Sequence, residues 1–319
     1  MQTFLSCDWG TTNFRLRLID AATGTILSEV ATNEGIQATY NNWNLYKMPT
    51  ITRVAFYQSI IANAIVNLEA QYDASLTNIP IVVSGMASSS IGMVELPYKQ
   101  IPLSLENMNP GHVVMEVTEN FNHRLLLISG IKSDDDVMRG EETKIAGCYN
   151  SNEEGKHLFI IPGTHSKHVK TEGKNLTAFS TFMTGEIFNI LSTGSILKAS
   201  VRTASFNQQY HKSFANGVIS GSTTNILHSL FTTRTNQLFS KYNKEENYFY
   251  LSGLLIGNEL KDIVHQAFDS IHLICNKTME PYYQAALQLL LPSKTIQIID
   301  SDVALIQGQL KIATALNFI

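Results

Sequence analysis

The first third of the chain has the hydrophobic pattern of several short strands and one helix. Residues 3–7 form a mostly apolar run, and apolar and polar side chains alternate over 14–18, as they do in strands. A longer stretch then carries its apolar side chains on one side of a helix. In chain order, the pattern predicts strands over 3–7, 14–18 and 26–31, a helix over 52–72 and a strand over 79–83.

A similar pattern begins again near the middle of the chain. The apolar run over 157–161 ends at a turn that contains Gly163, just as the first run ends at a turn that contains Gly10. The later predicted elements are a strand ending at Thr181, a helix over 251–264, strands over 271–275 and 295–299, and a closing helix over 303–316. We therefore expect one architecture to be used twice.

The length of the chain suits two domains of ordinary size, because 319 residues are too many for one small core. We predict an N-terminal domain over 1–122 and a C-terminal domain over 123–319, with the last helix packing back at the domain junction. Each domain would offer one strand–glycine–strand turn. Two such turns, one on each domain, are what a triphosphate would need from both sides.

Composition excludes several classes of protein. Hydrophobic residues make up 44% and charged residues 16%, which is ordinary for a globular protein, and the net charge of −4 argues against a nucleic-acid partner. Cys7, Cys148 and Cys275 form no CxxC pair, so we expect neither a disulfide framework nor a zinc site, and a reducing cytosol fits. The pattern contains no signal peptide and no membrane span, and we predict a cytoplasmic protein.

The first glycine turn, Asp8-Trp-Gly-Thr-Thr-Asn13, allows two interpretations. Glycine with Asn or Asp is typical of an ordinary hairpin between two strands. Alternatively, Gly10 lets the backbone approach an anion, the N–H groups of Thr11 and Thr12 bind phosphate, and Asp8 holds a metal ion through water. This stretch alone does not decide between the two.

Six segments together carry a family resemblance. They occur in the family's order and spacing over residues 8 to 257, and the chain resembles the 2-dehydro-3-deoxygalactonokinases of the actin, heat-shock chaperone and sugar-kinase superfamily. The segments are Asp8-Trp-Gly-Thr-Thr-Asn13, Val83-Ser-Gly-Met86, Val137-Met-Arg-Gly-Glu-Glu-Thr143, Pro162-Gly-Thr-His165, Phe182-Met-Thr-Gly-Glu186 and Leu251-Ser-Gly-Leu-Leu-Ile-Gly257.

The resemblance implies both a fold and a reaction. The fold would be α/β, with two ribonuclease H-like (actin-like ATPase) domains and a central cleft. The reaction would be ATP-dependent phosphorylation, with Mg2+, of the terminal 6-hydroxyl of 2-dehydro-3-deoxy-D-galactonate in galactonate breakdown. A kinase for another sugar acid or a ketose stays open, as does a nucleotide-switched binding protein of the chaperone or actin type. Whether the chain forms a homo-oligomer also stays open.

Phosphoryl transfer needs positioning, charge neutralisation and a group that orients and deprotonates the attacking hydroxyl. By the resemblance, Asp8 lies near magnesium and the two turns contact the phosphates; the alternative for each turn residue is a solvated position. The phosphate-binding candidates are Gly10, Thr11 and Thr12 in the first turn, and Gly163, Thr164, His165, Ser166 and Lys167 in the second.

The general base is expected at the start of a helix that follows Arg139-Gly140. Acidic side chains there are also favoured by the helix dipole alone. Glycerol kinase-like relatives place a catalytic aspartate after a glycine at the equivalent helix start. By that similarity Glu141 is the first candidate for the base and Glu142 the second, whereas the acidic run 134–136 is interpreted as a solvated loop.

The remaining candidates concern the sugar acid and the adenosine. The small residues of 84–90 fit a substrate wall or a plain flexible loop. An arginine would bind the sugar carboxylate, with Arg139 the first candidate and Arg15 the second, unless either forms a surface or interdomain ion pair instead. A helix beginning near Thr184 could face sugar or phosphate or merely be capped. The substrate candidates are Ser84, Gly85, Met86, Ser88, Arg139, Arg15, Thr184 and Glu186.

Gly253 and Asn276 are the candidates for the adenosine end of ATP. Gly253 and Gly257 lie four apart on one helical face, which most simply indicates close packing, although related kinases run adenosine near this helix. Asn276 stands where the family usually has glycine, and asparagine tolerates the left-handed conformation that glycine would supply.

Overall fold

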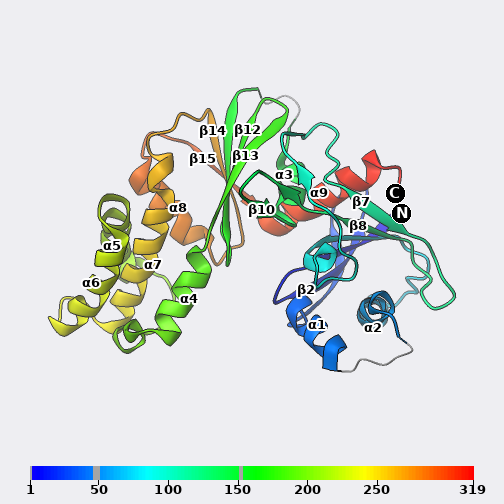
Figure 1. The fold of residues 1–319 in the computed structure, drawn as a ribbon, viewed down its shortest axis with the longest axis horizontal. Helices are drawn as coiled ribbons and strands as arrows, with labels where there is room; N and C mark the ends of the chain where they lie inside the picture. The colour runs from blue at the N-terminus through cyan, green and yellow to red at the C-terminus, as the bar shows by residue number, and fades with distance from the viewer. Residues whose placement is uncertain (1, 46–50, 151–153) are drawn as a thin grey trace. The chain divides into compact units, whose positions relative to one another are not determined.

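The computed structural model describes residues 2–45, 51–150 and 154–319, which form two compact units (Figure 1). Unit 1 comprises Met1–Glu154, Lys174–Ala178 and Ser301–Ile319, and unit 2 comprises Gly155–Gly173 and Phe179–Asp300. The boundary expected after residue 122 is therefore too early. Residues 123–154 stay with unit 1 because β8 (Leu125–Ile128) extends its sheet and α3 (Glu141–Cys148) packs on its last helix.

Unit 1 is built on a six-stranded mixed sheet. The strand order is β3-β2-β1-β4-β8-β7, in which β1, β2 and β3 form an antiparallel meander and β4 and β8 run parallel to β1. The bounds are β1 Thr3–Trp9, β2 Phe14–Asp20, β3 Ile26–Thr32, β4 Ile81–Gly85, β8 Leu125–Ile128 and β7 His112–Met115.

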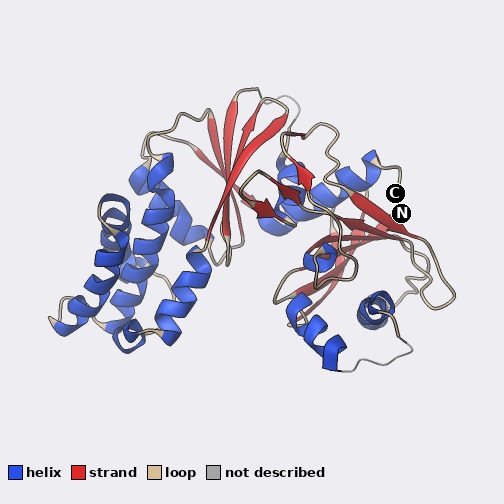
Figure 2. Cartoon of the chain, in the orientation of Figure 1, coloured by secondary structure: helices blue, strands red, loops and turns tan. Residues whose placement is uncertain are grey.

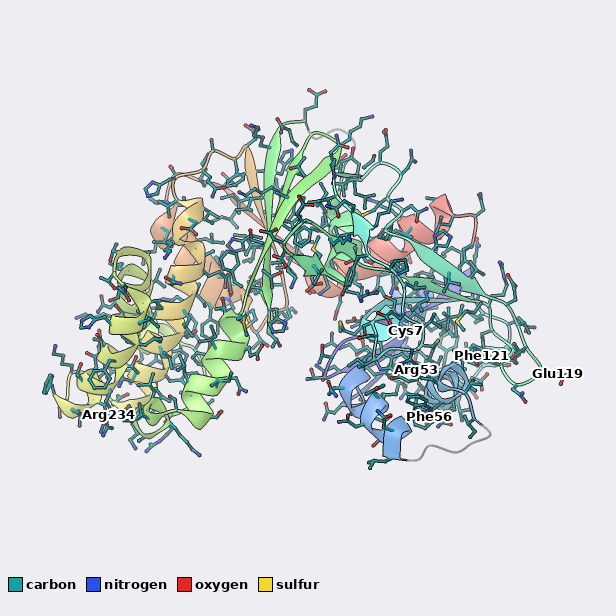
Figure 3. The ribbon with its side chains drawn as sticks, in the orientation of Figure 1. Cys7, Arg53, Phe56, Glu119, Phe121 and Arg234 are labelled. Atoms are coloured by element: carbon teal, nitrogen blue, oxygen red, sulfur yellow. The ribbon has the colours of Figure 1, made fainter. Side chains whose placement is uncertain are left out.

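The remaining elements of unit 1 cover this sheet or connect its strands. The core contains Cys7 and Phe121, and Phe56 of α2 packs against it (Figure 3). The helices are α1 (Ile36–Leu45), α2 (Arg53–Tyr72), α3, α9 (Ser301–Ala315) and the short η1 (Met86–Ser88); a small sheet is formed by β5 (Lys99–Gln100), β9 (Ile131–Lys132) and β10 (Val137–Met138).

Unit 2 repeats the plan of unit 1. Its strands follow the order β15-β14-β11-β12-β13, and β14 and β15 run parallel to β11. The strands are β11 Lys156–Ile161, β12 Ser166–Glu172, β13 Asn175–Phe182, β14 Ser270–Cys275 and β15 Ile296–Asp300; the first residues of β13 belong to unit 1 and pair with β6 (Leu103–Ser104).

Along the chain, the helices of unit 2 occur in two places, between β13 and β14 and between β14 and β15; helices are blue in Figure 2. They are α4 (Thr184–Gly194), η2 (Ile196–Ser200), η3 (Gln208–Tyr210), α5 (His211–Thr223), α6 (Ile226–Leu238), α7 (Lys244–Leu260), η4 (Lys261–Ile263) and α8 (Glu280–Leu290).

The two sheets correspond strand for strand, and this confirms that one architecture is used twice. The strand order β3-β2-β1-β4-β8 matches β13-β12-β11-β14-β15, and in each unit the first strand turns into the second at a glycine, Gly10 or Gly163.

Across the described residues, no helix is both long and apolar enough to cross a membrane.

Glycines let two pairs of helices cross at backbone contact. In unit 1, a Cβ built on Gly308 of α9 would lie 1.8 Å from the carbonyl oxygen of Thr143 on α3. In unit 2, Cβ atoms built on Gly253 and Gly257 of α7 would lie 2.2 Å from carbonyl oxygens of α5. Real Cβ atoms do not approach so closely, so only glycine allows these crossings. The close-packing interpretation of Gly253 and Gly257 is correct.

Candidate active site

The first glycine turn offers two free N–H groups in a fixed backbone. Gly10 N–H donates to the Asn13 carbonyl (2.9 Å), and the carbonyls of Gly10, Thr11 and Thr12 accept N–H groups of residues 35–37. Among the described residues, the N–H groups of Thr11 and Thr12 have no acceptor. The hairpin expected from the sequence is present, and its exposed N–H groups could bind an anion.

Asp8 lies beside this turn in a cluster of charges. Its carboxylate is 26% exposed and lies 3.8 Å from Arg15 of β2; Arg15 also lies 3.4 Å from Asp302. Asp302 is the second residue of α9 and forms a further ion pair, of 2.8 Å, with the buried Arg17. Sequence reasoning missed Asp302, because it lies 287 residues from Arg15 and nothing in its local pattern links the two.

Two glycines bring the start of α3 against the ends of β1 and β4. A Cβ on Gly85 would lie 2.7 Å from the carbonyl oxygen of Trp9, and one on Gly140 would lie 3.1 Å from Gly85 Cα. Both glycines have positive φ, 93° and 107°, which other residues adopt with strain. This backbone contact places Glu141, the first residue of α3, at the same edge of the sheet as the Asp8 turn.

The two glutamates of α3 differ in what they can reach. Glu142 is fully buried, and its two carboxyl oxygens accept the Gly140 N–H at 2.9 and 2.7 Å. Burial, with the neighbouring Glu141 charge, raises the pKa of Glu142 to about 8. Glu141 is half-buried and accepts the N–H of Arg139 at 3.1 Å. Exposure and access to solvent therefore favour Glu141 over Glu142 as a proton acceptor for a ligand.

Arg139 does not match the role of carboxylate ligand that the sequence suggested. It is 8% exposed, and its Nη1 donates to the carbonyl and hydroxyl oxygens of Ser88 at 2.5 Å. Its Nη2 donates to the Leu96 carbonyl, and the guanidinium lies 4.2 Å from the centre of the Tyr98 ring. These contacts hold the 84–90 loop in shape, and they leave Arg15 as the exposed candidate for a substrate carboxylate.

The hydroxyls of the 84–90 loop also face the protein interior. Ser84 is fully buried and accepts a hydrogen bond from Gln309 of α9 (2.9 Å). Ser88 is fully buried and donates to the Ile128 carbonyl (2.7 Å). The expectation that Ser84 and Ser88 bond to a sugar is therefore wrong, because both hydroxyls already have protein partners. Of the four loop candidates, Met86 alone is partly exposed.

The second glycine turn, in unit 2, is supported by the start of α4. A Cβ on Gly185 would lie 2.5 Å from the Gly163 carbonyl oxygen and 2.9 Å from Thr164 Cα, and the Glu186 N–H donates to the Thr164 carbonyl at 3.0 Å. Gly163 itself is exposed and has no other atom closer than 3.8 Å to such a Cβ. The turn is therefore fixed from one side and open on the other.

The side chains around this turn divide into exposed and buried ones. His165 Nε2 lies 2.5 Å from Glu186 Oε2, and both side chains are partly exposed. Lys167 and Ser166 are buried; Lys167 Nζ donates to the His165 carbonyl (3.5 Å), and the Ser166 hydroxyl contacts Tyr283 (3.0 Å). The Ser166 hydroxyl therefore faces the interior rather than a phosphate.

A cavity of about 380 Å³ in unit 2 lies directly beside the turn. Its walls are mainly aromatic and aliphatic, with a few hydroxyls, which is the usual composition of a small-molecule site. The lining residues are Gly163, Thr164, Thr184, Gly185, Phe188, Tyr248, Ser252, Leu255, Ile256, Thr278, Met279, Tyr282 and Tyr283. Thr184, a sugar candidate from the sequence, therefore lines this cavity, and its neighbour Glu186 contacts the turn through His165.

Gly253 has the packing role that its spacing indicated, whereas Asn276 differs from the expectation. Gly253 faces α5, whereas its neighbours Ser252 and Leu255 line the cavity. Asn276 is absent from the described residues with positive φ, so it does not replace glycine by a left-handed conformation. Its side-chain oxygen instead accepts the N–H groups of Thr278 and Met279, which starts α8 beside the cavity.

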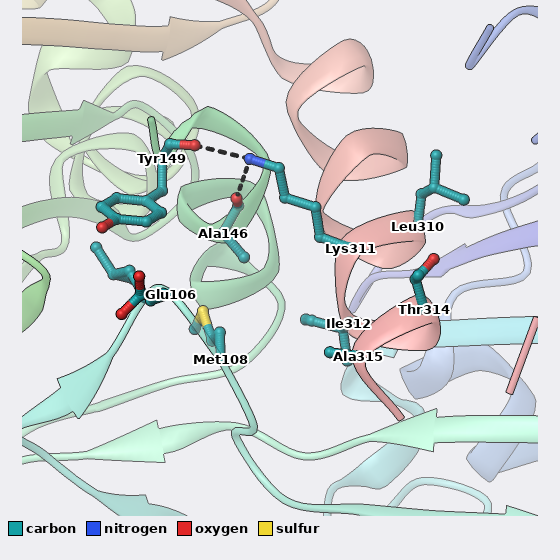
Figure 4. A pocket seen from close by; sticks show the side chains of 10 residues that line it. Glu106, Met108, Ala146, Tyr149, Leu310, Lys311, Ile312, Thr314 and Ala315 are labelled. Atoms are coloured by element: carbon teal, nitrogen blue, oxygen red, sulfur yellow. Dashed lines mark hydrogen bonds between the residues drawn. The ribbon is translucent and has the colours of Figure 1, made fainter. Parts of the chain in front are cut away.

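A second cavity, of about 560 Å³, lies in unit 1 between α3, α9 and the segment around Met108 (Figure 4). The amine of Lys311 donates to carbonyls of Ala146, Gly147 and Tyr149 at the end of α3, and burial lowers its pKa. The walls are mostly apolar. This cavity contains none of the candidate residues, and the Lys311 amine already caps the end of α3.

Two units with one repeated sheet order, a glycine turn in each and a cavity beside one of them define the actin-like ATPase and sugar-kinase class of folds. The fold match to the activator of 2-hydroxyisocaproyl-CoA dehydratase from Clostridium difficile, solved with bound ADPNP, agrees: TM-score 0.50 at 11% identity, covering 99% of this chain and 96% of that one.

Sequence comparison defines the family more narrowly. The family described as 2-keto-3-deoxy-galactonokinase matches residues 8–312, and the chain belongs to this family. A protein described as probable 2-dehydro-3-deoxygalactonokinase from Rhizobium meliloti is 28% identical over 316 residues, which cover 96% of this chain and 94% of that protein. The 2-dehydro-3-deoxygalactonokinase of Escherichia coli is 30% identical over 66% of this chain and 70% of its own.

A solved structure gives the same result. The crystal structure of a Sinorhizobium meliloti protein matches this chain with a TM-score of 0.83 at 26% identity, covering 98% of this chain and 96% of that chain. That protein is described as a 2-dehydro-3-deoxygalactonokinase. The activity that goes with the family name is ATP-dependent phosphorylation of the sugar acid.

Proposed function

We propose that the protein transfers the γ-phosphoryl group of ATP to the 6-hydroxyl of 2-dehydro-3-deoxy-D-galactonate, a step of galactonate breakdown. One observation supports assigning the nucleotide to one unit and the sugar acid to the other. Of the two equivalent glycine turns, the one in unit 2 adjoins a cavity with aromatic walls, and the one in unit 1 adjoins exposed carboxylates. Unit 2 is therefore suited to the nucleotide, and unit 1 to the acceptor and the chemistry.

In this proposal the nucleotide occupies the 380 Å³ cavity, with its phosphates toward the Gly163–Thr164 turn. The aromatic rings of Phe188, Tyr248 and Tyr282 form the apolar surface that a planar base needs. His165, which is partly exposed beside the turn, is within reach of a phosphate. The first turn would contact phosphate through the N–H groups of Thr11 and Thr12, which have no acceptor in the described structure.

Mg2+ is the metal that kinases of this kind use, and the donor set of unit 1 fits it. No three His, Cys, Asp or Glu side chains gather into a metal site within residues 2–45, 51–150 and 154–319. Mg2+ bound to ATP needs only one or two carboxylates, because phosphate oxygens and water complete its shell. Asp8 is the partly exposed carboxylate beside the turn and would hold it. The ion supplies charge neutralisation on the phosphates when it is bound.

Glu141 is proposed as the general base. It would take the proton of the 6-hydroxyl while the hydroxyl oxygen forms a bond to the γ-phosphorus and the bond between that phosphorus and the bridging oxygen of ADP breaks. Arg15 is proposed to bind the carboxylate of the sugar acid, because its guanidinium is partly exposed beside Asp8 and is the candidate arginine that is not buried.

The test is a panel of sugar acids and ketoses, each incubated with the protein, ATP and Mg2+, with products identified by mass. The expected result is a phosphorylated product from 2-dehydro-3-deoxy-D-galactonate that exceeds all others. A larger signal from a different sugar acid or a ketose would change the substrate and keep the kinase. ATP hydrolysis at one rate regardless of the added sugar would favour a nucleotide-switched binding protein instead.

A further inference from the structure

A buried carboxylate, Glu259 of α7, lies behind the wall of the cavity in unit 2. It is 2% exposed, and three side chains from three different elements meet it. Its Oε1 lies 3.0 Å from His168 Nε2, and its Oε2 accepts the hydroxyl of Tyr283 at 2.8 Å. The same Oε2 also accepts the hydroxyl of Thr184. Two of these partners, Thr184 and Tyr283, line the cavity itself.

This arrangement fixes the direction of the hydrogen bonds. Thr184 and Tyr283 both donate their hydroxyl hydrogens to Glu259 Oε2. The oxygen of Tyr283 is then free to accept, and the Ser166 hydroxyl lies 3.0 Å from it. A hydroxyl carries one hydrogen. Thr184, which is half-buried at the cavity wall, therefore offers a ligand only its lone pairs.

A hydrogen-bond acceptor in that position selects for a donor on the ligand. Phosphate oxygens of ATP are acceptors and do not suit it. Thr184 is joined through Gly185 to the Gly163–Thr164 turn, where the backbones are in contact. The group next to the phosphates in a nucleoside triphosphate is the ribose, whose 2′- and 3′-hydroxyls are donors.

We propose that Thr184, oriented by Glu259, accepts a hydrogen bond from the 2′- or 3′-hydroxyl of the ribose and makes the cavity prefer ATP over the analogue that lacks that hydroxyl. This inference rests on the proposed function, because it takes the cavity as the site of ATP. It adds a residue that determines sugar specificity and a buried residue that positions it. In this proposal, Thr184 and Glu259 act on nucleotide selection and leave proton transfer to unit 1.

The direct test is calorimetric binding of ATP, 2′-deoxy-ATP and 3′-deoxy-ATP to the full chain and its variants. The unchanged protein is expected to bind one deoxy analogue roughly five- to tenfold more weakly than ATP, which is the range of one hydrogen bond. Thr184→Val keeps the shape and removes the acceptor, so ATP should weaken to the level of that analogue. Thr184→Ser should restore the preference.

Thr193→Val is the matched control, because Thr193 lies on the same helix α4, is exposed, and bonds to the Asn189 carbonyl (2.7 Å). It should leave all three affinities unchanged. Glu259→Gln should reduce the ATP preference while thermal unfolding reports whether the buried network still holds. Because Glu259→Gln could lose stability, the comparison of Thr184→Val with Thr184→Ser decides the test.

The outcomes distinguish a failure of the role given to Thr184 from a failure of the cavity as the nucleotide site. Equal binding of ATP and both deoxy analogues by the unchanged protein, or an undiminished preference in Thr184→Val, would overturn the role of Thr184 and leave the nucleotide site in place. No binding of any of the three nucleotides would overturn the assignment of the cavity, and this inference with it.

Discussion

The two glycine turns occupy the same place in two equivalent sheets, yet the protein supports them in different ways. In unit 1 the turn is tied to the start of α1 through its carbonyls, and the nearest side chains, Asp8 and Arg15, are charged and partly exposed. In unit 2 the turn is in backbone contact with α4 at Gly185, and the group behind it is Glu259, a buried carboxylate whose partners surround it.

This difference separates two tasks that one fold has to perform. Charges exposed to solvent can exchange partners when a ligand arrives, as a metal-linked carboxylate must. A buried, fully bonded carboxylate cannot exchange partners without a large desolvation cost, and it is suited to holding neighbouring groups in one geometry. We therefore propose that the duplicated architecture supplies a reactive half in unit 1 and a nucleotide-binding half in unit 2. Variants at the two turns should produce different kinds of defect.

The largest expected effect is at the start of α3 in unit 1. Glu141→Gln removes the proposed base and should lower kcat by roughly 10²–10⁴-fold, the usual value of a positioned acid or base. ATP and sugar binding should stay nearly unchanged in calorimetry. Glu142→Gln is the matched control, because Glu142 is adjacent and fully buried; it should affect stability more than kcat. The reverse result would assign the base to Glu142.

The next effect concerns the carboxylate beside the first turn. Asp8→Asn keeps the size of the side chain and removes its charge, so kcat should fall about a hundredfold, in line with the several kcal/mol that a metal ion supplies in such sites. The magnesium concentration needed for half-maximal rate should rise, and the far-ultraviolet circular dichroism should not change. Near-normal turnover at low magnesium would contradict the role given to Asp8.

The helix crossing that carries Glu141 can be broken separately from its chemistry. Gly308→Ala would place a Cβ 1.8 Å from the Thr143 carbonyl oxygen, so α9 and α3 must move apart, at a cost of about 1–3 kcal/mol in the free energy of unfolding. A urea titration measures this loss. Gly194→Ala is the control in unit 2, since no atom lies within 4 Å of its added Cβ. Equal stability of the two variants would show that the crossing tolerates a methyl group.

Much of the fold could be predicted from the sequence because its signals are local. The predicted strands agree with the observed ones to within about two residues, and the repeated order of strand and glycine turn follows from spacing alone. The buried strand β8 and its neighbour β7 were not predicted. The spacing of Gly253 and Gly257 also gave their packing role. The domain boundary was missed, because the place of β8 and α3 in unit 1 depends on their contacts with β4 and α9, which are distant parts of the chain.

The site was predicted less completely, since a side chain's partners are set by tertiary structure. Ser84 and Ser88 sit in a small-residue loop that looks exposed, but Gln309 and Arg139 come from distant segments and occupy both hydroxyls. The charge of Arg139 predicts a ligand for a carboxylate, but its burial is not visible in the sequence. Asp302 and Glu259 were missed for the same reason: each acts through partners far away in the chain.

Glu142 predicts a specific dependence of stability on pH. Its pKa rises from 4.5 in the unfolded chain to about 8 in the folded protein, mainly because it is buried. Between these values the folded state holds a proton that the unfolded state has lost. The free energy of unfolding should therefore fall by about 1.4 kcal/mol for each pH unit from 4.5 toward 8, and level off above. Urea titrations across this range measure the slope, and Glu142→Gln should remove that part of it.

The smallest expected effect is at Arg15, and it tests whether the exposed charges of unit 1 exist for binding or for stability. Arg15 forms partly exposed ion pairs with Asp8 and Asp302, and such pairs contribute about 0.2–1 kcal/mol each. Arg15→Gln should therefore leave the melting temperature nearly unchanged and raise KM for the sugar acid up to about fivefold, with KM for ATP unaltered. Arg124→Gln removes another exposed ion pair, with Glu116, and should change neither KM. If Arg15→Gln lowers the melting temperature and leaves both KM values alone, the arginine belongs to the scaffold, and the sugar carboxylate is bound by another residue.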